Sequence, residues 1–508
     1  MQVREYGKAF ATRQVSFWTA RPHLITIALG ILLAGLFASG LRIVREPAQL
    51  DLIPGQVAGS RSDFDDYYRA SRAFAAGDTD PYHINNLTQA ARLFGLADQD
   101  PNHLLEAILL LRQVGSYLYP PWLAFLLTPL TVFSYPVAAV LFQLASVLSL
   151  ALALYIMRRM LVEFGNLSIG EALLACLLTL VAIAAFMDGN AANGNVGFFL
   201  IALFAAVLYG LLKPGWRYTL LAGFLLGIAI AIKVTPVFWG LLILATRRWL
   251  AGIMALLGLV LALFLPGFFY GHARNLVYLH DWYDLILHSY QKLTFIRSWT
   301  NNQSIVAAVG RFFLEGQDAA QYQWGLPWLV WPALHGGERL EWFAALSQKI
   351  NLSWQFALLI LAVRIGLRDG IAMLWSPAAW LARTAEYRLI GQRAFIWLLV
   401  WLVSVSLFTA GVSWFHAYSM LFVPLVLYCG RRLVEIRAGR WTRPLWSERV
   451  WLGMLLLFGL FFLLLPSLVR EGLAMYAVFV ALQCLVLPGL WIEAWRGPHS
   501  GGAKPDGF

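Results

Sequence analysis

Long apolar runs separated by short polar stretches dominate the chain. The clearest runs approach or exceed the roughly 17 to 25 residues that a helix needs to cross about 30 Å of hydrocarbon. They cover residues 24–43, 136–157, 168–187, 195–212, 249–269 and 473–492. The runs lack the roughly ten-residue segments of alternating polar and apolar positions that are typical of membrane β-barrels. The pattern therefore predicts an all-α, polytopic membrane protein.

Short groups of Lys and Arg lie between the apolar runs and orient them. Such groups are expected to be cytoplasmic, and all of them can be so if residues 119–133 do not cross the membrane. Three prolines interrupt that segment, so we expect a juxtamembrane or re-entrant helix on the outer face. This arrangement gives about twelve spans with both termini in the cytoplasm. Residues 217–246 fit either two short spans that turn near Lys233 or one kinked span.

The same topology divides the chain into cytoplasmic, membrane and outer-face parts. These are a cytoplasmic leader at 1–23, a first transmembrane helix at 24–43, an outer loop with juxtamembrane helices at 44–135, a transmembrane module at 136–269, a second outer segment at 270–350, C-terminal transmembrane helices at 351–495 and a cytoplasmic tail at 496–508. The first outer loop is typical of amphipathic helices at roughly 64–76, 86–97 and 102–115. Both outer segments are far longer than ordinary connections, which predicts a reaction or binding chamber on that face.

Composition and charge agree with a membrane protein. Apolar residues make up 60% of the chain and charged residues 13%, which leaves too little polar surface for a water-soluble particle. The net charge of +11 is spread between apolar runs rather than along one stripe, so we expect no nucleic-acid partner. The three cysteines form no CxxC pair, and His280, Asp281 and His288 are too loosely spaced for a metal site. We expect neither a metal nor a cofactor.

Two charged residues stand out before any family is considered. Asp63 follows the first apolar run and opens a predicted helix; partial desolvation near the bilayer would make it a competent base, while capping of the helix is the alternative role. We expect Asp65 and Asp66 to be solvated charges on the helix face. Lys233 is isolated among apolar residues, which indicates function unless the side chain snorkels to the interface.

Over about residues 20 to 430 the chain resembles the bacterial polyprenol-phosphate-mannose-dependent α-mannosyltransferases of glycosyltransferase family 87. The resemblance rests on motifs in a fixed order: Asp63-Phe64-x-x-Tyr67-Tyr68, Gly77, Pro81-Tyr82, Tyr119-Pro120-Pro121, Gly194-Asn195, Lys233-x-Thr235-Pro236, Asn302-Gln303-Ser304 with Arg311, and Ser413-Trp414-x-His416. It implies a fold of the GT-C type, a location in the bacterial inner (plasma) membrane, and a lipid-linked sugar donor.

The resemblance also implies a reaction. A hexose, expected to be mannose, passes with inversion from a polyprenyl-phosphate-linked donor to a lipid- or glycan-linked acceptor on the outer face. Asp63 matches the proposed general base, and Lys233 and His416 become candidates to neutralise the leaving phosphate. A hydrogen-bonded interfacial histidine is the other interpretation of His416.

Further motif residues complete the expected donor-binding set. Asn302 and Gln303 suit sugar hydroxyls or the capping of a loop, and Arg311 suits a phosphate or a headgroup anchor. Tyr67, Tyr119 and Asn195 are included because they belong to the same motifs.

One motif departs from the family pattern. Relatives commonly carry Gly-Gln-x-Asn where this chain has Gly194-Asn195-Val196-Gly197. Asn195 can substitute for the longer amide, but Gly197 supplies no side chain.

A lipid or glycolipid flippase is the alternative function, because a dozen spans and a buried lysine fit it too. Transporters commonly contain internal repeats, and this sequence shows none. Convergence of Asp63, Lys233 and His416 on one outer cavity would favour the enzyme.

Overall fold

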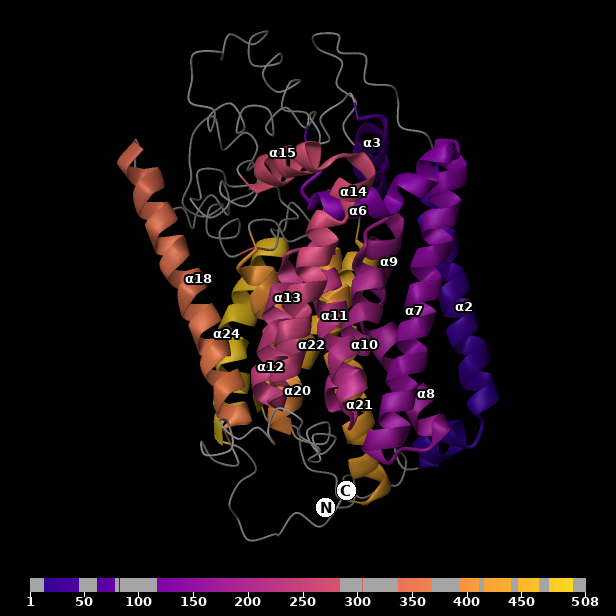
Figure 1. The fold of residues 1–508 in the computed structure, drawn as a ribbon. Coiled ribbons are helices and arrows are strands. Elements are labelled where there is room, and N and C mark those ends of the chain that lie inside the picture. Colours follow the sequence, from indigo (N-terminus) through magenta and orange to yellow (C-terminus); the bar gives the residue numbers. More distant parts are fainter. Residues whose placement is uncertain are drawn as a thin grey trace.

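The computed structural model describes residues 13–44, 62–77, 82, 117–283, 304, 337–367, 393–410, 415–439, 446–465 and 475–496. Within these ranges its regular elements are all helices, as the hydrophobic pattern predicts. Most of them run side by side along one direction, and Figure 1 shows this bundle from its side.

The elements are α2 (Pro22–Gly40), η1 (Leu41–Val44), α3 (Asp63–Ala76), α6 (Pro121–Leu127), η2 (Thr128–Val132), α7 (Tyr135–Gly165), α8 (Ile169–Ala182), α9 (Ala184–Ala192), α10 (Gly197–Leu212), α11 (Trp216–Ile232), η3 (Thr235–Gly240), α12 (Leu241–Thr246), α13 (Trp249–Phe264), α14 (Pro266–Tyr270), α15 (His272–Trp282), α18 (Gly337–Gly366), α20 (Arg393–Phe408), η8 (Phe415–Leu421), α21 (Phe422–Arg437), α22 (Trp446–Leu464) and α24 (Met475–Arg496). The η elements are 3₁₀ helices.

Several helices meet the requirements of a membrane span by length and composition. In the described part of the chain four of them do so alone: Pro22–Val44, Tyr135–Gly165, Trp249–Tyr270 and Gln348–Gly366. Helices α8 and α9 pass together and are bent by 70° at their junction, and further apolar helices are shorter. The prediction of an all-α, multi-pass membrane protein is confirmed, and the number of about twelve spans stays a prediction.

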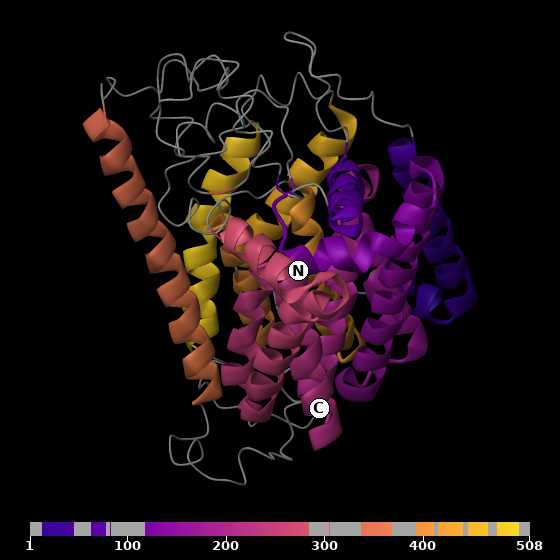
Figure 2. The same ribbon diagram turned by 45° about the horizontal axis from the view of Figure 1, so that its top comes forward.

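Short helices that follow α2 and α13 gather at one end of the bundle (Figure 1). Helices α3, α6, α14 and α15 all lie at this end in Figure 1. Figure 2 brings the end forward and shows the pink α15 lying across the ends of the bundle helices. The helix predicted at 64–76 is confirmed as α3, and α6 with η2 provides the short helix expected at 119–133. The helices expected at 86–97 and 102–115 lie outside the described residues.

Basic groups predicted to share one face meet at the opposite end of the bundle. Lys213 Nζ lies 2.9 Å from a carboxylate oxygen of Glu163 at the end of α7. Arg248 donates to the carbonyl of Leu211, 3.2 Å away, and Arg437 lies 2.7 Å from a carboxylate oxygen of Glu171 at the start of α8. Because α10 runs from Gly197 to Leu212 between the two ends, these charges are one helix length away from α3.

The chain turns back on itself at Lys233. Helix α11 ends at Ile232, and Lys233 is extended, with φ −149° and ψ 138°. The chain then returns through η3 and α12, because Arg248 reaches the carbonyl of Lys213 near the beginning of α11. Of the two interpretations of residues 217–246, the structure shows two short segments that turn near Lys233.

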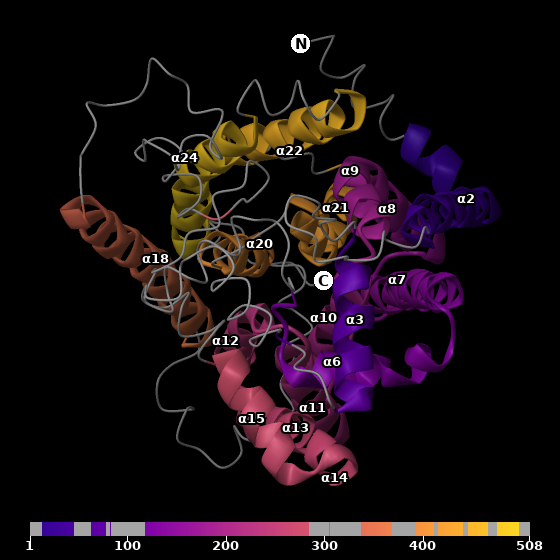
Figure 3. The same cartoon turned by 90° about the horizontal axis from the view of Figure 1, so that it is seen from above.

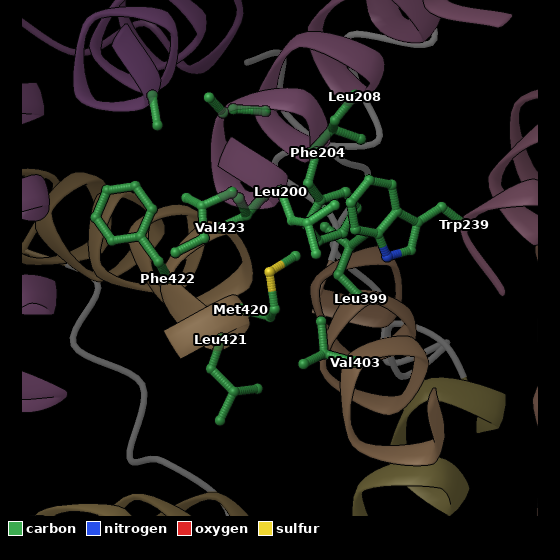
Figure 4. Packing of buried hydrophobic residues seen from close by; sticks show 14 of the residues in the cluster. Leu200, Phe204, Leu208, Trp239, Leu399, Val403, Met420, Leu421, Phe422 and Val423 are labelled. Carbon is green, nitrogen blue, oxygen red and sulfur yellow. The ribbon is translucent and has the colours of Figure 1, made fainter. Parts of the chain in front are cut away.

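The apolar core beneath this turn is formed by α10, η3, α20 and α21. Seen from above, α20 and α21 lie inside the outline of the other helices, with α2 and α18 at opposite edges (Figure 3). Phe204 stacks on Trp239 with ring centroids 4.6 Å apart. Figure 4 shows this contact beside Val403 and Met420. This apolar packing supports the region in which the motif residues meet.

Candidate active site

A tight turn between α9 and α10 presents Asn195. Gly194 has φ +61°, and a Cβ at this position would lie 2.8 Å from Cβ of Phe64, so glycine is required on both counts. The side-chain Oδ1 of Asn195 accepts the backbone N–H of Gly197 at 2.9 Å. This bond spans the two residues that lead into α10 and fixes the amide, leaving its Nδ2 to face α3.

Asp63 is the first residue of α3 and is held against this turn. Its backbone N–H donates to the carbonyl of Asn193 at 2.8 Å. Its Oδ2 accepts from Asn195 Nδ2 at 2.5 Å. The helix cap is Ser62, whose hydroxyl accepts the N–H of Asp65. The alternative role of Asp63 as an N-cap is therefore wrong, and its carboxylate is left for the site.

Two tyrosines surround the same amide. Tyr67 donates to the hydroxyl of Tyr119 at 2.9 Å. The Nδ2 of Asn195 lies 3.5 Å from the Tyr67 hydroxyl and 3.4 Å from that of Tyr119. Burial, followed by nearby groups that include Asp63, raises the pKa of both phenols, so both keep their protons at neutral pH.

Lys233 approaches the cluster from the turn between α11 and η3. Its Nζ lies 5.5 Å from the centroid of the Tyr119 ring, within the range of a cation–π contact, worth about 0.5 to 2 kcal/mol depending on desolvation. The ammonium thus lies at the site and not at a distant interface, which contradicts simple snorkelling. Tyr119 is the shared neighbour of Asn195 and Lys233.

His416 reaches the carboxylate from η8. Its Nε2 lies 3.6 Å from Asp63 Oδ2, and the imidazole is 5% exposed. The structure thus places His416 next to the expected base, in the same cluster as Lys233. A histidine that merely hydrogen-bonds at the membrane interface would not need this position.

The environment of Asp63 is suited to a proton acceptor. Burial raises the pKa of its carboxyl above the ordinary 3.8, whereas the hydrogen bond from Asn195 and the charge of Lys233 lower it. Burial is the largest of the three effects. The side chain is still 24% exposed, so an acceptor hydroxyl can reach it. A partly desolvated, accessible carboxylate is a stronger base than a solvated one.

A cavity opens beside the cluster, between α10, η3, α20 and η8. Asn195, Lys233, Thr235, Ser406 and Ser419 contribute its polar wall. Its other lining residues are apolar or lack a side chain: Gly197, Leu200, Trp239, Val403, Leu407, Ala417 and Met420. A single cation in a mostly apolar lining suits an anionic group attached to a hydrophobic chain.

The structure brings together six of the predicted site residues: Asp63, Tyr67, Tyr119, Asn195, Lys233 and His416. Asn302, Gln303 and Arg311 lie outside the described residues, and their roles stay predictions. His280 and Asp281 are neighbours in α15, and His280 Nδ1 lies 3.6 Å from a carboxylate oxygen of Asp281. Among the described residues no group of three or more His, Cys, Asp or Glu side chains could hold a metal.

One expectation about α3 is wrong. Asp65 is not a solvated charge, because it is only 1% exposed and bonds to Arg69 Nε at 2.9 Å. Helix α3 packs against α6 and η2, and in the assembled bundle water does not reach Asp65. Asp66 is half-buried.

Sequence reasoning also missed the pair formed by Asn190 and Ser419. Asn190 Nδ2 donates to Ser419 Oγ at 3.1 Å across 229 residues of sequence. Neither residue belongs to a recognised motif, and their separation leaves no local signal. Only the glycine at position 197 hinted that another side chain occupies this space.

Comparisons with known proteins locate the chain in a family. Two matching solved structures are of ArnT from Cupriavidus metallidurans, one bound to undecaprenyl phosphate and the other in the apo state. The first is 13% identical with a TM-score of 0.36, and the alignment covers 93% of this chain and 78% of ArnT. The second is 14% identical with a TM-score of 0.31, covering 94% and 76%. No curated protein matches this chain in sequence.

The sequence profile of glycosyltransferase family 87 matches residues 117–404, more than half of the 508. The match includes Tyr119, Asn195 and Lys233, while Asp63 and His416 lie outside it, one on each side. The fold nevertheless places both of them at the matched residues, within contact of Asn195 or of each other. The resemblance seen in the motif order is confirmed: the chain belongs to glycosyltransferase family 87 and is a membrane glycosyltransferase.

Proposed function

We propose that this protein transfers a hexose, with mannose as the expected sugar, from a polyprenyl-phosphate-linked donor to a glycolipid or glycan acceptor at the outer face of the bacterial plasma membrane. The observation that carries the proposal is the meeting of Asp63 and Lys233 at Asn195 and Tyr119. An accessible carboxylate and an ammonium in one cluster supply the base and the phosphate partner that such a transfer requires.

The reaction assigns one task to each charge. Asp63 accepts the proton of the acceptor hydroxyl through the carboxylate oxygen that Asn195 does not occupy. The acceptor oxygen then forms its bond to the anomeric carbon as the bond from that carbon to the phosphate oxygen breaks. Both electrons of the broken bond leave with the polyprenyl phosphate, and Lys233 stabilises the added negative charge. Attack opposite the leaving group inverts the anomeric configuration.

His416 and the tyrosines support this arrangement. His416 lies 3.6 Å from the Asp63 carboxylate and is placed to donate to it or to the departing phosphate. Tyr67 donates its proton to the Tyr119 hydroxyl, so the proton of Tyr119 can be donated to a sugar oxygen. The convergence of Asp63, Lys233 and His416 supports the enzyme over the flippase, because transport of a lipid needs no general base.

The test of the base is Asp63→Asn in purified protein, with transfer from a labelled polyprenyl-phosphate hexose as the readout. Ser62 caps α3, so folding should be intact, while turnover should fall about 10²-fold or more. Asp66→Asn, on the same helix, is the matched control and should remain active. Full activity of Asp63→Asn would remove this residue from the mechanism.

The test of the phosphate partner is Lys233→Met, which keeps the length of the side chain and removes its charge. We expect a large loss of apparent affinity for the lipid-linked donor with the protein still folded. If the variant bound the donor as the wild type does, the assignment of Lys233 would be wrong.

A further inference from the structure

Asn190 fills the space in which a side chain at position 197 would lie. A Cβ built on Gly197 would be 1.8 Å from Asn190 Nδ2 and 3.3 Å from its Oδ1. The amide of Asn190 is 1% exposed and its position depends on the absence of that Cβ. The residue that departs from the family pattern is therefore matched by a buried amide from the preceding helix, α9.

The contact of Asn190 with Ser419 leaves a hydrogen-bond donor to account for. A serine hydroxyl accepts two hydrogen bonds and donates one. Ser419 Oγ accepts from Asn190 Nδ2 at 3.1 Å, and the described part of the chain shows no hydrogen bond in which Ser419 donates its own hydrogen. Ser419 is completely buried, and leaving a buried donor without a partner is unfavourable.

Ser419 is one of the residues that line the cavity, as is Lys233. Ser406 lies on the same wall, but its hydroxyl already donates to the carbonyl of Val403 at 2.7 Å. Of these two serines, only Ser419 has a hydrogen left for a ligand. Its neighbours in the cavity are one cation and mostly apolar groups, which is the surrounding that a lipid phosphate requires.

We propose that Ser419, positioned by Asn190, donates a hydrogen bond to a phosphate oxygen of the polyprenyl-phosphate ligand whose charge Lys233 balances. The inference rests on the proposed function and adds two residues to it: Ser419 as a ligand-binding residue and Asn190 as a positioning residue. Gly197 leaves room for the Asn190 amide because it has no side chain.

The experiment measures binding of polyprenyl phosphate, without a sugar, to the full-length protein in lipid nanodiscs. Ser419→Ala should weaken binding about 10- to 100-fold, the usual effect of a lost hydrogen bond to a charged group. Ser149→Ala, outside the cavity, is the control and should change the affinity less than about twofold, since its hydroxyl donates to the carbonyl of Ala145 in α7. Equal losses in the two variants, or wild-type affinity in Ser419→Ala, would overturn the inference.

The same experiment separates this inference from the proposed function. If the wild-type protein binds polyprenyl phosphate and Ser419→Ala binds it equally well, only the role of Ser419 fails. If the wild type binds inorganic phosphate but not the lipid-linked form, or binds neither, the lipid-linked donor itself is wrong and the inference falls with it.

The positioning role of Asn190 is tested through Gly197. Gly197→Ala must displace the Asn190 amide, so we expect it to weaken binding as Asn190→Ala does. The double variant should be no worse than Asn190→Ala, because removal of the amide makes room for the new methyl group. Gly453→Ala, where no atom lies within 4 Å of the added Cβ, controls for the general effect of the substitution. Additive losses in the double variant would refute the positioning role.

Discussion

The contacts of Asn195 make its replacement the sharpest test of how the site works. The side chain donates to Asp63 at 2.5 Å through Nδ2 and accepts the N–H of Gly197 at 2.9 Å through Oδ1. Asn195→Ala removes both bonds. Asn195→Asp keeps the acceptor for Gly197 but replaces the donor with a second carboxylate. The pair of variants therefore separates the support of the base from the support of α10.

The expected magnitudes follow from these two bonds. A hydrogen bond to a charged group is worth about 1.5 to 3 kcal/mol, which corresponds to a fall in kcat/KM of about 10- to 150-fold in Asn195→Ala. Loss of the bond to Gly197 should cost about 1 kcal/mol of stability, as removal of a helix cap does. Asn195→Asp should keep that stability and lose at least as much activity, because two carboxylates then compete for one site.

The dependence of kcat/KM on pH adds a second readout. The hydrogen bond from Asn195 lowers the pKa of Asp63, against the larger effect of burial. Without that bond the pKa rises further, and the base is protonated at a higher pH. The acid side of the profile should therefore move to higher pH in Asn195→Ala, and further in Asn195→Asp. The assay is sugar transfer in nanodiscs across a range of pH, and an unchanged profile in Asn195→Asp would refute the reasoning.

Three further predictions concern stability and topology. The pKa of Asp63 is raised in the folded protein, so its contribution to stability is complete below the unfolded pKa and is lost as the pH rises through the folded pKa. Asp63→Asn should therefore raise the melting temperature at neutral pH, by an amount that shrinks toward acid pH. A lower melting temperature at neutral pH would contradict this. Ser168 and Glu171 share a capping box, and Glu171 also pairs with the half-exposed Arg437. In unfolding measurements Ser168→Ala should cost about 1 kcal/mol of stability and Glu171→Ala about 1 to 2 kcal/mol. Equal losses would show that the ion pair contributes nothing. Val132 lies beside α3 and is 79% exposed, and Trp216 lies at the other end of the bundle and is 54% exposed. Val132→Cys should react with an impermeant thiol reagent in intact cells, whereas Trp216→Cys should react only after permeabilisation. The reverse result would invert the topology.

The sequence was sufficient to find the core of the site because its residues occur at the ends of apolar segments. Each crossing of the bundle returns the chain to one of two ends, so Asn195 before α10 and Lys233 after α11 had to share one end once the basic groups shared the other. Asp63 stood out by its place after the first apolar run, and the motif order then added the two tyrosines and His416. The length of the apolar runs was equally informative for the class of fold.

Other features depend on packing that no local pattern encodes. The spacing Ser62-x-x-Asp65 is a capping signal and could have excluded the cap role of Asp63. Nothing along the chain, however, indicated that Asp65 would be buried. The bond between Asn190 and Ser419 joins α9 to η8 and exists only in the assembled bundle.

The contact of Asp63 with His416 has a consequence for the biosynthesis of the protein. His416 is made about 350 residues after Asp63, an interval of about 20 to 70 s at the usual rate of roughly 5–20 residues per second. Late in that interval the growing chain holds Asp63, Asn195 and Lys233 but still lacks the imidazole and Ser419. The cluster is therefore completed only when η8 has been made, and a chain that stops before η8 carries the cavity without the wall that η8 contributes.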